Sequence, residues 1–525
     1  MIFNSFEYLI FFPIVFLVYY LLPKTKYRNV FLLVASLYFY GSWMPKYLIL
    51  ILTTIGITYL TGILIDKSIK YKKLYLFLGI LINLVILVIF KYNNFFITNI
   101  NGVFKLLNIS WVIKDNFNIM LPVGISFYTF QSIGYCIDVY RKDVKCEKNF
   151  IIYATFVTFF PQLVAGPIER SSNLIKQFNE HHTFKYEKGV EGLRYILEGM
   201  FRKVVIADTI AILVNGVYNG LSSYTGLTLV LATILFSIQI YCDFSGYSLI
   251  AIGSGKILGF ELMENFKYPY LSKSFKEFWG RWHISLSTWF KDYIYIPLGG
   301  SKKGFCRKLF NILVIFTISG LWHGAAWTFI FWGVLHAVYR IVEEIYLKYF
   351  QKNTSNDDSE NKKLSKDNNV IRYLELNQKE FKKIKKYNNL INIVKIIIIY
   401  FFVNVGWVFF RANSLRDISI FFSNLFKDIG LKQAYWNFYY IIYSTLLNKE
   451  IFVYFIFFII FISILYLFYH EIISKKYSLS VSGFYQKIKK KRYIVYCVQT
   501  ILIILVYLIL SSTYGQSGQF IYFQF

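Results

Sequence analysis

Charged residues are scarce in this 525-residue chain: Asp, Glu, Lys and Arg make up 16% of it, against roughly 25% in soluble domains. Several soluble domains could not be coated with so little polar material, which argues against a soluble multidomain enzyme. Because 56% of the residues are hydrophobic and 21% aromatic, a disordered chain, a collagen-like chain and a disulfide scaffold are also excluded. The composition predicts a polytopic membrane protein.

Several motifs are also missing. The five cysteines show no C-x-x-C and no metal-ligand spacing, so we predict neither a disulfide framework nor a metal site. There is no Walker motif and no G-x-G-x-x-G, which removes the main support for an ATP-driven pump. A serine-nucleophile elbow, G-x-S-x-G, is absent as well. No repeat of 20–50 residues indicates a solenoid or a propeller.

Acidic residues are outnumbered, and the formal net charge is +28. This excess could indicate nucleic-acid binding, but the basic residues stand in short blocks between apolar runs, as in Lys67–Lys73 and Lys487–Arg492. Such blocks are typical of the cytoplasmic loops of membrane proteins. We therefore expect a lipid bilayer and no nucleic acid as the partner of this surface.

Apolar stretches long enough to approach the roughly 20 residues of a spanning helix recur along the chain. The fold class we predict is an all-α polytopic membrane protein with about 11 transmembrane helices and several re-entrant or partial helices. The clearest candidate stretches are Phe6–Leu22, Tyr47–Ile65, Leu74–Phe90, Leu309–Ser319 continuing toward Tyr346, Leu390–Phe410, Ile451–Tyr469 and Tyr493–Leu510. The less regular ones are Val30–Trp43, Met120–Ile137, Ile151–Val164, Leu193–Val217 and Leu227–Leu258.

The distribution of Lys and Arg predicts the orientation of these helices. Basic groups follow the first and third apolar stretches, so the N-terminus is expected outside the cell. No basic region precedes the first stretch, which is therefore read as a span and not as a cleavable signal. Residues 1–525 are predicted to form a single membrane domain. Within it, Lys348–Lys386 is rich in lysine and reads as a cytoplasmic, partly disordered loop.

Polar residues inside apolar runs are the places to look for chemistry, because burying them is costly. His323 lies in the stretch SGLWHGAAW, which interrupts the apolar run from Leu309 to Val342. An ionisable group there is a candidate functional residue, and the glycines beside it permit close approach of a ligand or a helix. His336, about 3.6 turns further on, need not share a face with His323 and is left without a role.

A second polar stretch, FWGRWHISLSTWFKDY, runs from Phe278 to Tyr293. An interfacial amphipathic helix, with aromatic rings at headgroup depth, explains part of this pattern. It explains His283, which stands between Trp282 and Ile284, less well. We therefore keep both interpretations, an interfacial helix and a functional site.

A third polar stretch, QIYCDFSGYS, places Gln239, Asp243 and Tyr247 on one helical face. Asp243 is interpreted either as a structural contact between helices or as part of a substrate cavity. His470 stands at the end of an apolar stretch and is interpreted as a surface residue.

The chain resembles the membrane-bound O-acyltransferase family. The resemblance rests on FKYPY at residues 266–270, on the stretch from Phe278, on LWHG at residues 321–324, on GPIER at residues 166–170 and on YCDFSGYS at residues 241–248. Within the family, it is most similar to the bacterial branch that contains the alginate O-acetyltransferase membrane subunit and the membrane protein of teichoic-acid D-alanylation. The ending GQFIYFQF also fits this branch.

The resemblance implies a ring of tilted helices around a thinned central funnel. It also implies an enzyme that moves an acyl group across the membrane to an extracellular acceptor. The near-invariant histidine of the family falls on His323, and its second polar position falls on His283.

From these observations we expect an O-acetyltransferase of the bacterial cell membrane that acts on an exported polysaccharide, with acetyl-CoA as donor. His323 is the expected general base, because an imidazole with a pKa near 6.5 accepts protons at physiological pH. His283 is expected to orient it, and Trp282 and Trp322 to exclude water. Asp243 and Arg281 are further candidates for substrate binding. The expected partners are an extracellular esterase-like acyl-relay protein and the polysaccharide synthesis machinery.

Two alternatives remain open at the level of sequence. A transporter or flippase of lipid-linked sugars shares the many spans and the intramembrane polar groups, although we see no paired inverted repeats. A structural scaffold for a polysaccharide synthase would need no histidine at all.

Overall fold

The computed structural model describes residues 1–43, 45–114, 121–164, 166–350, 378–445, 449–477, 483 and 492–514. Within these ranges every regular element is a helix, which confirms the predicted all-α class. In chain order the elements are α1 (Phe6–Leu21), α2 (Thr25–Gly41), η1 (Pro45–Tyr47), α3 (Leu48–Lys67), α4 (Lys72–Leu106), α5 (Ile125–Arg141), α6 (Phe150–Thr158), α7 (Phe160–Leu163), α8 (Ser171–Phe178), α9 (Tyr186–Met200), η2 (Phe201–Ala207), α10 (Asp208–Tyr218), η3 (Leu221–Ser223), α11 (Gly226–Leu258), η4 (Pro269–Leu271), α12 (Phe275–Trp279), α13 (Ile284–Phe290), η5 (Lys291–Tyr295), α14 (Phe305–His323), α15 (Trp327–Tyr349), α18 (Gln378–Arg411), α19 (Leu415–Asn424), α20 (Leu431–Thr445), α21 (Glu450–Tyr477) and α23 (Arg492–Tyr514).

The chain forms two compact units. The first consists of residues 1–265, 322–326 and 419–525, and the second of residues 266–321 and 327–418. His323 therefore belongs to the first unit and His283 to the second, and each is described within its own unit.

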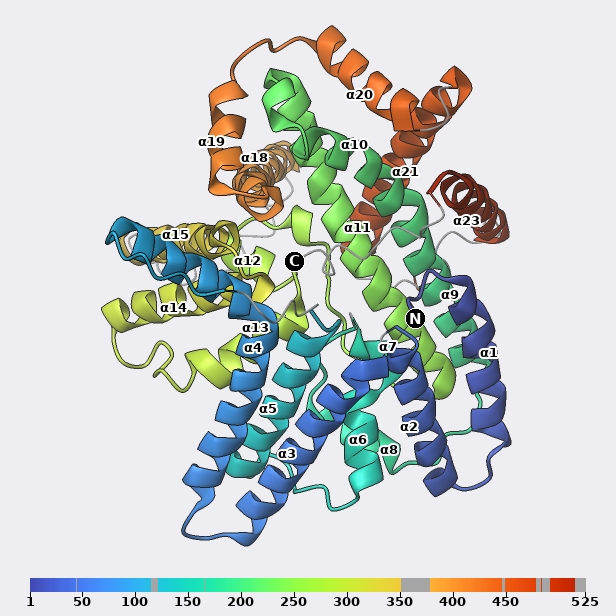
Figure 1. Ribbon diagram of the computed structural model, residues 1–525. Coiled ribbons are helices and arrows are strands. Elements are labelled where there is room, and N and C mark those ends of the chain that lie inside the picture. Colours follow the sequence, from blue (N-terminus) through green and yellow to red (C-terminus); the bar gives the residue numbers. More distant parts are fainter. Residues whose placement is uncertain are drawn as a thin grey trace, which may run out of the picture. The chain divides into compact units, whose positions relative to one another are not determined.

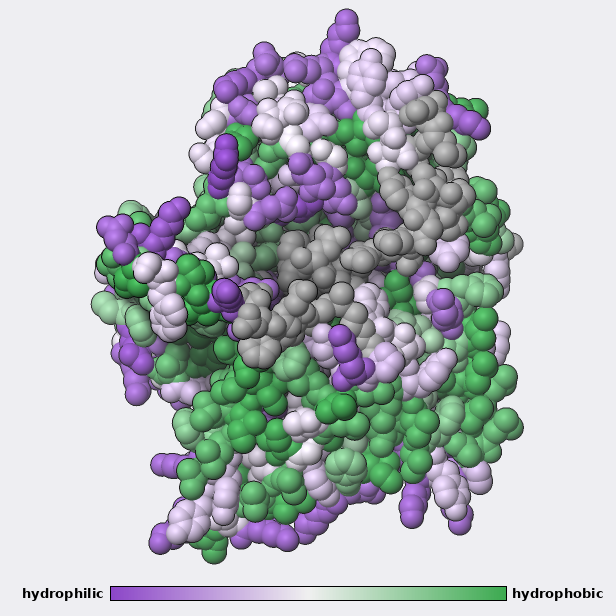
Figure 2. Space-filling view, viewed as in Figure 1, coloured by the Kyte–Doolittle hydropathy of each residue, from purple (hydrophilic) through white to green (hydrophobic). Residues whose placement is uncertain are grey.

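In the first unit, the N-terminal helices pack side by side, and α4 lies along α3 and α5 (Figure 1). The exposed side of α4 carries a stripe of large apolar side chains at a spacing of four residues: Phe77, Leu81, Val85 and Ile89. Figure 2 shows hydrophobic residues gathered where Figure 1 places α3, α4 and α5, with hydrophilic residues at the rim. A soluble protein rarely exposes so broad an apolar surface, whereas a lipid-facing helix requires one.

Within the part of the chain that the structure describes, six helices are long and apolar enough to cross a membrane. Two shorter helices, Phe6–Leu21 and Tyr496–Leu508, are apolar as well. These elements support a polytopic membrane protein. The six long segments are Pro45–Lys67, Lys72–Leu106, Gly226–Leu258, Phe305–His323, Asn389–Arg411 and Glu450–Lys476.

The apolar run predicted to continue from Leu309 toward Tyr346 is two helices, not one. α14 ends at His323 and α15 begins at Trp327, so the helical conformation is interrupted at Gly324 and the two alanines after it. The two helices pack closely, because a Cβ atom on Gly320 would lie 2.3 Å from the backbone oxygen of Phe329. The break places His323 at a helix end and not in the middle of a continuous span.

The segment Ile151–Val164 is also divided, as its Phe-Phe-Pro sequence predicts. α6 ends at Thr158, and the four-residue helix α7 follows from Phe160 to Leu163. Because Pro161 has no backbone N–H, it is tolerated in the first turn of α7 but not inside a longer helix.

The C-terminal boundary of the loop predicted at Lys348–Lys386 is wrong. α18 begins at Gln378, so the last nine residues of this segment are helical. Its first residues, up to Tyr349, complete α15. A high lysine content does not by itself indicate a loop, because lysine is a good helix former. Residues 351–377 lie outside the described part of the chain.

α9 and α11 approach each other through glycines, which allow two backbones to pack closely in a membrane. A Cβ on Gly199 would lie 2.6 Å from the backbone oxygen of Gly246, and one on Gly192 would lie 2.6 Å from that of Gly253. These contacts leave no room for even one methyl group on either glycine of a pair.

We predict that Gly199→Ala lowers the thermal unfolding midpoint of the detergent-purified protein. Overpacking typically costs about 1–3 kcal/mol, since the helices must move apart to admit the methyl group. The matched control is Gly56→Ala in α3, because a Cβ at Gly56 meets no atom within 4 Å. Equal midpoints for the two variants would contradict the close approach of α9 and α11.

Candidate functional site

His323 is the last residue of α14, and its side chain is buried, with 4% of the residue exposed. Together with Trp322 it lines a cavity of about 50 Å³ in the first unit. The other lining residues come from the interior of α4, from the start of α5 and the segment before it, and from the residue that follows α7: Lys91, Leu121, Pro122, Val123, Gly124, Ile125, Ser126, Phe127 and Val164. A small cavity that an imidazole lines suits proton transfer to or from a bound group.

Trp322 forms one wall of this site. Its ring packs against Phe127 and Phe130 of α5, with centroid separations of 5.4 and 5.7 Å, and lies 4.9 Å from the ring of His323. Trp322 thus lies where the predicted wall of the site would be, and its role in excluding water stays a prediction.

Lys91 is a residue of this site that the sequence analysis missed. Its Nζ donates to the backbone oxygens of Trp322, at 2.5 Å, and His323, at 3.2 Å. The predicted span Leu74–Phe90 ends one residue before this lysine and therefore excludes it. α4 in fact continues to Leu106, which places Lys91 well inside the helix. The signal that could have placed Lys91 inside the helix is the return of apolar residues after it.

His283 is buried in the second unit, with 1% of the residue exposed. It precedes α13 and has a positive φ of 44°, a backbone region that residues other than glycine rarely adopt and that is enriched at functional sites. Burial lowers the pKa of the His283 imidazole to about 3, so the ring is neutral at physiological pH. A neutral imidazole can accept one hydrogen bond and donate another.

Trp282 lies within an aromatic cluster of the second unit. Its ring contacts Phe266, Phe278 and Trp407, with centroid separations of 5.1, 5.7 and 5.0 Å. This packing holds the backbone that carries His283. Arg281, the neighbouring candidate, forms an ion pair of 2.6 Å with Glu277 one helical turn earlier.

Asp243 is buried in α11 and forms an ion pair with Lys203 of η2, at 2.6 Å. Lys203 also pairs with Asp208, at 2.7 Å. The ion pair supports the structural interpretation of Asp243, as a contact between helices.

A larger cavity, of about 460 Å³, lies in the second unit. Its apolar lining includes Ile284 and Phe316, and Lys276 and Lys291 contribute cationic groups. The cavity adjoins the polar stretch from Phe278 to Tyr293, which supplies Trp279, Gly280, Leu286, Ser287, Thr288 and Phe290 to its lining. Apolar walls with several ammonium groups suit a molecule that has both an apolar arm and phosphate groups.

His336 is fully buried in the second unit and is surrounded by aromatic rings. Trp279 and Trp332 lie 5.1 and 5.0 Å from it, centroid to centroid. A Cβ on Gly406 would lie 2.7 Å from its Nε2 atom. This packing is that of a core residue, in agreement with its having been left without a role. Among the described residues, no three His, Cys, Asp or Glu side chains gather closely enough to hold a metal ion.

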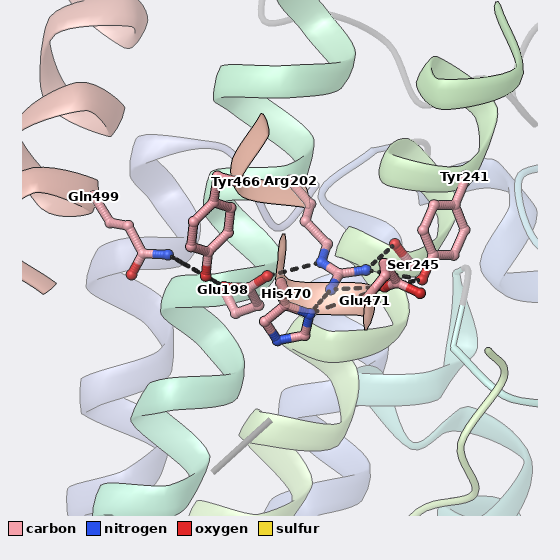
Figure 3. A network of polar contacts seen from close by, with 8 residues as sticks. All are labelled: Glu198, Arg202, Tyr241, Ser245, Tyr466, His470, Glu471 and Gln499. Carbon is pink, nitrogen blue, oxygen red and sulfur yellow. Dashed lines mark hydrogen bonds and ion pairs between the residues drawn. The ribbon is translucent and has the colours of Figure 1, made fainter. Parts of the chain in front are cut away.

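His470, interpreted above as a surface residue, is buried, and only 3% of it is exposed. That interpretation is wrong because α21 continues to Tyr477, well beyond the predicted end of the apolar stretch. Nδ1 of His470 accepts a hydrogen bond from the guanidinium of Arg202, at 3.2 Å. Figure 3 shows the two residues within a network of polar side chains.

This network joins η2 and α9 to α11, α21 and α23 (Figure 3). Nε of Arg202 donates to Glu198 at 2.9 Å, and its NH2 group lies 3.5 Å from Glu471. The hydroxyl of Tyr241 donates to Glu471 at 2.7 Å. Tyr466 and Gln499 both donate to the other oxygen of Glu198, at 2.8 and 3.2 Å. Each carboxylate thus has several donors, as burial of a charge requires.

The helices, the apolar outer surface and the buried histidine sites define a multi-pass membrane protein. A family model of the membrane-bound O-acyltransferases matches residues 147–374. A probable alginate O-acetylase of Pseudomonas putida is 37% identical over 430 residues, which cover 81% of this chain and 80% of that protein. The chain belongs to the membrane-bound O-acyltransferase family, and it is an O-acyltransferase.

Two further relatives show the breadth of the match. A peptidoglycan O-acetyltransferase of Helicobacter pylori is 32% identical over 439 residues, 78% of this chain and 76% of that protein. A teichoic acid D-alanyltransferase of Bacillus subtilis is 28% identical over 255 residues, 45% of this chain and 62% of that protein. The predicted family resemblance is confirmed.

Proposed function

We propose that this enzyme transfers an acetyl group to an exported polysaccharide at the bacterial cell membrane. The observation that carries the proposal is His323, buried at the end of an apolar helix and facing a small cavity. The relatives from Pseudomonas putida and Helicobacter pylori, which act on alginate and peptidoglycan, support the choice of acetyl group and polymer.

The proposed donor is acetyl-CoA from the cytoplasm. The cavity of about 460 Å³ supports this choice, because its lysines suit the phosphates of the donor and its apolar walls suit the pantetheine arm. In the proposed reaction, His323 removes the proton from an acceptor hydroxyl. The hydroxyl oxygen then bonds to the acetyl carbon, the carbon–sulfur bond breaks, and the departing thiolate takes the proton from the imidazolium.

The remaining site residues have supporting roles in this proposal. His283 has an orienting role, and Trp282 and Trp322 exclude water that would hydrolyse the thioester. Asp243 and Arg281 are the further candidates for substrate binding. The acceptor is a serine of an extracellular esterase-like protein, which relays the acetyl group to the polysaccharide machinery.

The proposed topology has about 11 spans around a central funnel, the N-terminus outside and residues 348–386 inside. We predict that a cysteine introduced at Ser359 is not labelled by a membrane-impermeant maleimide in intact cells, because basic loops stay in the cytoplasm. Labelling should appear after lysis. The cysteine at position 359 is introduced into a protein in which the two exposed cysteines, Cys306 and Cys497, have been replaced. Their absence keeps background labelling low. Labelling before lysis would reverse the assignment.

The experiment that tests the proposed function uses the purified full-length protein in lipid nanodiscs with acetyl-CoA labelled in the acetyl group. We expect slow release of labelled acetate by the wild-type protein, with water as acceptor, and none by His323→Ala. The wild-type protein could instead neither consume acetyl-CoA nor transfer the label to an added esterase-like partner. That result would favour the alternative function, a transporter of lipid-linked sugars.

A further inference from the structure

Lys91 lies inside α4, a helix of 35 residues that is apolar enough to span a membrane. An ionisable side chain at such a place is costly unless it has partners, and it is a candidate functional residue. The partners of Lys91 all lie in the first unit. They are two backbone oxygens, of Trp322 and His323, and Oγ of Ser126, which lies 3.4 Å from Nζ.

The two backbone oxygens belong to the last two residues of α14. The final carbonyl groups of a helix have no partner within it, and they form its negative end. A lysine ammonium can donate up to three hydrogen bonds to such carbonyl oxygens, and its positive charge interacts favourably with the negative end of the helix dipole. Lys91 therefore holds the short turn that carries His323, from a helix more than 200 positions earlier in the sequence.

The surroundings keep this arrangement rigid. Nζ of Lys91 lies 5.7 Å from the centroid of the Trp322 ring, which favours a cation. Trp322 packs on Phe127 and Phe130 of α5, and α5 packs on α4. Lys91 and His323 are the titratable side chains among the described residues that line the cavity.

We propose that Lys91 is a positioning residue for acyl transfer: it fixes the backbone of His323 at the cavity, and its charge favours the neutral imidazole that accepts a proton. The inference rests on the proposed function of His323 as the base. A histidine displaced by about 1 Å can lose about a hundredfold in rate, because proton transfer requires close alignment.

The test compares Lys91→Met, which keeps length and removes both charge and donors, with Lys91→Arg, which keeps them. In nanodiscs with labelled acetyl-CoA, we expect Lys91→Met to lower kcat about ten- to a hundredfold, with KM changed less than twofold. Lys91→Arg should recover most of kcat. Lys105→Met is the matched control, because Lys105 is an exposed lysine of the same helix.

A second readout does not depend on turnover. Diethyl pyrocarbonate modifies neutral imidazole, and mass spectrometry measures the modification of His323 as a function of pH. Lys91→Met removes a positive charge near His323, so protonation of the His323 imidazole becomes less unfavourable. The pH at half-maximal modification should therefore move upward in Lys91→Met and stay unchanged in Lys91→Arg and Lys105→Met.

The outcomes separate this inference from the proposed function. Wild-type kcat and an unchanged modification midpoint in Lys91→Met would overturn the role of Lys91, even with His323→Ala inactive. Reduced membrane abundance of Lys91→Met with normal turnover per molecule and a normal midpoint would also overturn it, since that is a stability effect alone. Activity in His323→Ala would instead contradict the proposed base.

Discussion

His323→Ala should reach the membrane at normal abundance and lose most polymer acetylation. Removal of a general base typically costs about 10²–10⁴-fold in rate, and here the side chain lines a cavity. His323→Gln keeps polarity and part of the volume but cannot take up the proton, so it should fail as well. The measurement is polymer-bound acetyl ester in cells that express each variant at matched abundance.

His336→Ala provides the control for loss of a buried histidine away from this cavity. Its ring lies within aromatic packing, so the variant should lower stability and abundance while the enzyme that remains keeps its turnover per molecule. His283→Ala is expected to be impaired, less severely than His323→Ala, since water can replace part of an orienting group. Near-normal acetylation by His323→Ala would return the transporter to consideration.

His323 could be selected from the sequence as a candidate because one ionisable residue interrupts a long apolar run, and the structure places it beside a cavity. The fold class followed in the same way, from composition and from the lengths of the apolar stretches. The break after His323 could not be inferred so directly. It depends on the close packing of α14 on α15 through Gly320, which is a contact between two helices and not a property of either one.

Lys91 and His470 show the limit of a local interpretation. Lys91 follows Phe90 at the apparent end of a span, and its partners are more than 200 positions away. His470 also stands at an apparent span end, and its partner Arg202 is 268 positions away. A charged or polar residue beside an apolar run is correctly assigned to the surface only if no other helix covers it, and sequence periodicity carries no information on that point.

The polar network around Arg202 should be the part of the first unit most sensitive to a single substitution. Arg202→Met is expected to abolish accumulation of folded protein, or to lower its unfolding midpoint by far more than a surface substitution does. The guanidinium is the cation shared by Glu198 and Glu471, and removing one partner of a buried ion pair costs about 3–5 kcal/mol. Fluorescence-detected size-exclusion chromatography of heated, detergent-extracted samples measures the loss.

Two comparisons make this expectation specific to the buried charge. Lys188→Met breaks the ion pair with Glu261, at 2.9 Å, whose side chains are 41% and 49% exposed, and exposed pairs contribute about 0–1 kcal/mol. It should leave the midpoint almost unchanged. His470→Ala should have an intermediate effect, because it removes one acceptor for the guanidinium and leaves the ion pairs of Arg202 with Glu198 and Glu471 in place. The double variant Arg202→Met/Glu198→Gln should recover part of the stability of Arg202→Met, since it removes one of the two carboxylates left without a cation. Equal unfolding midpoints for Arg202→Met and Lys188→Met would show that the buried network stabilises the protein no more than an exposed ion pair does.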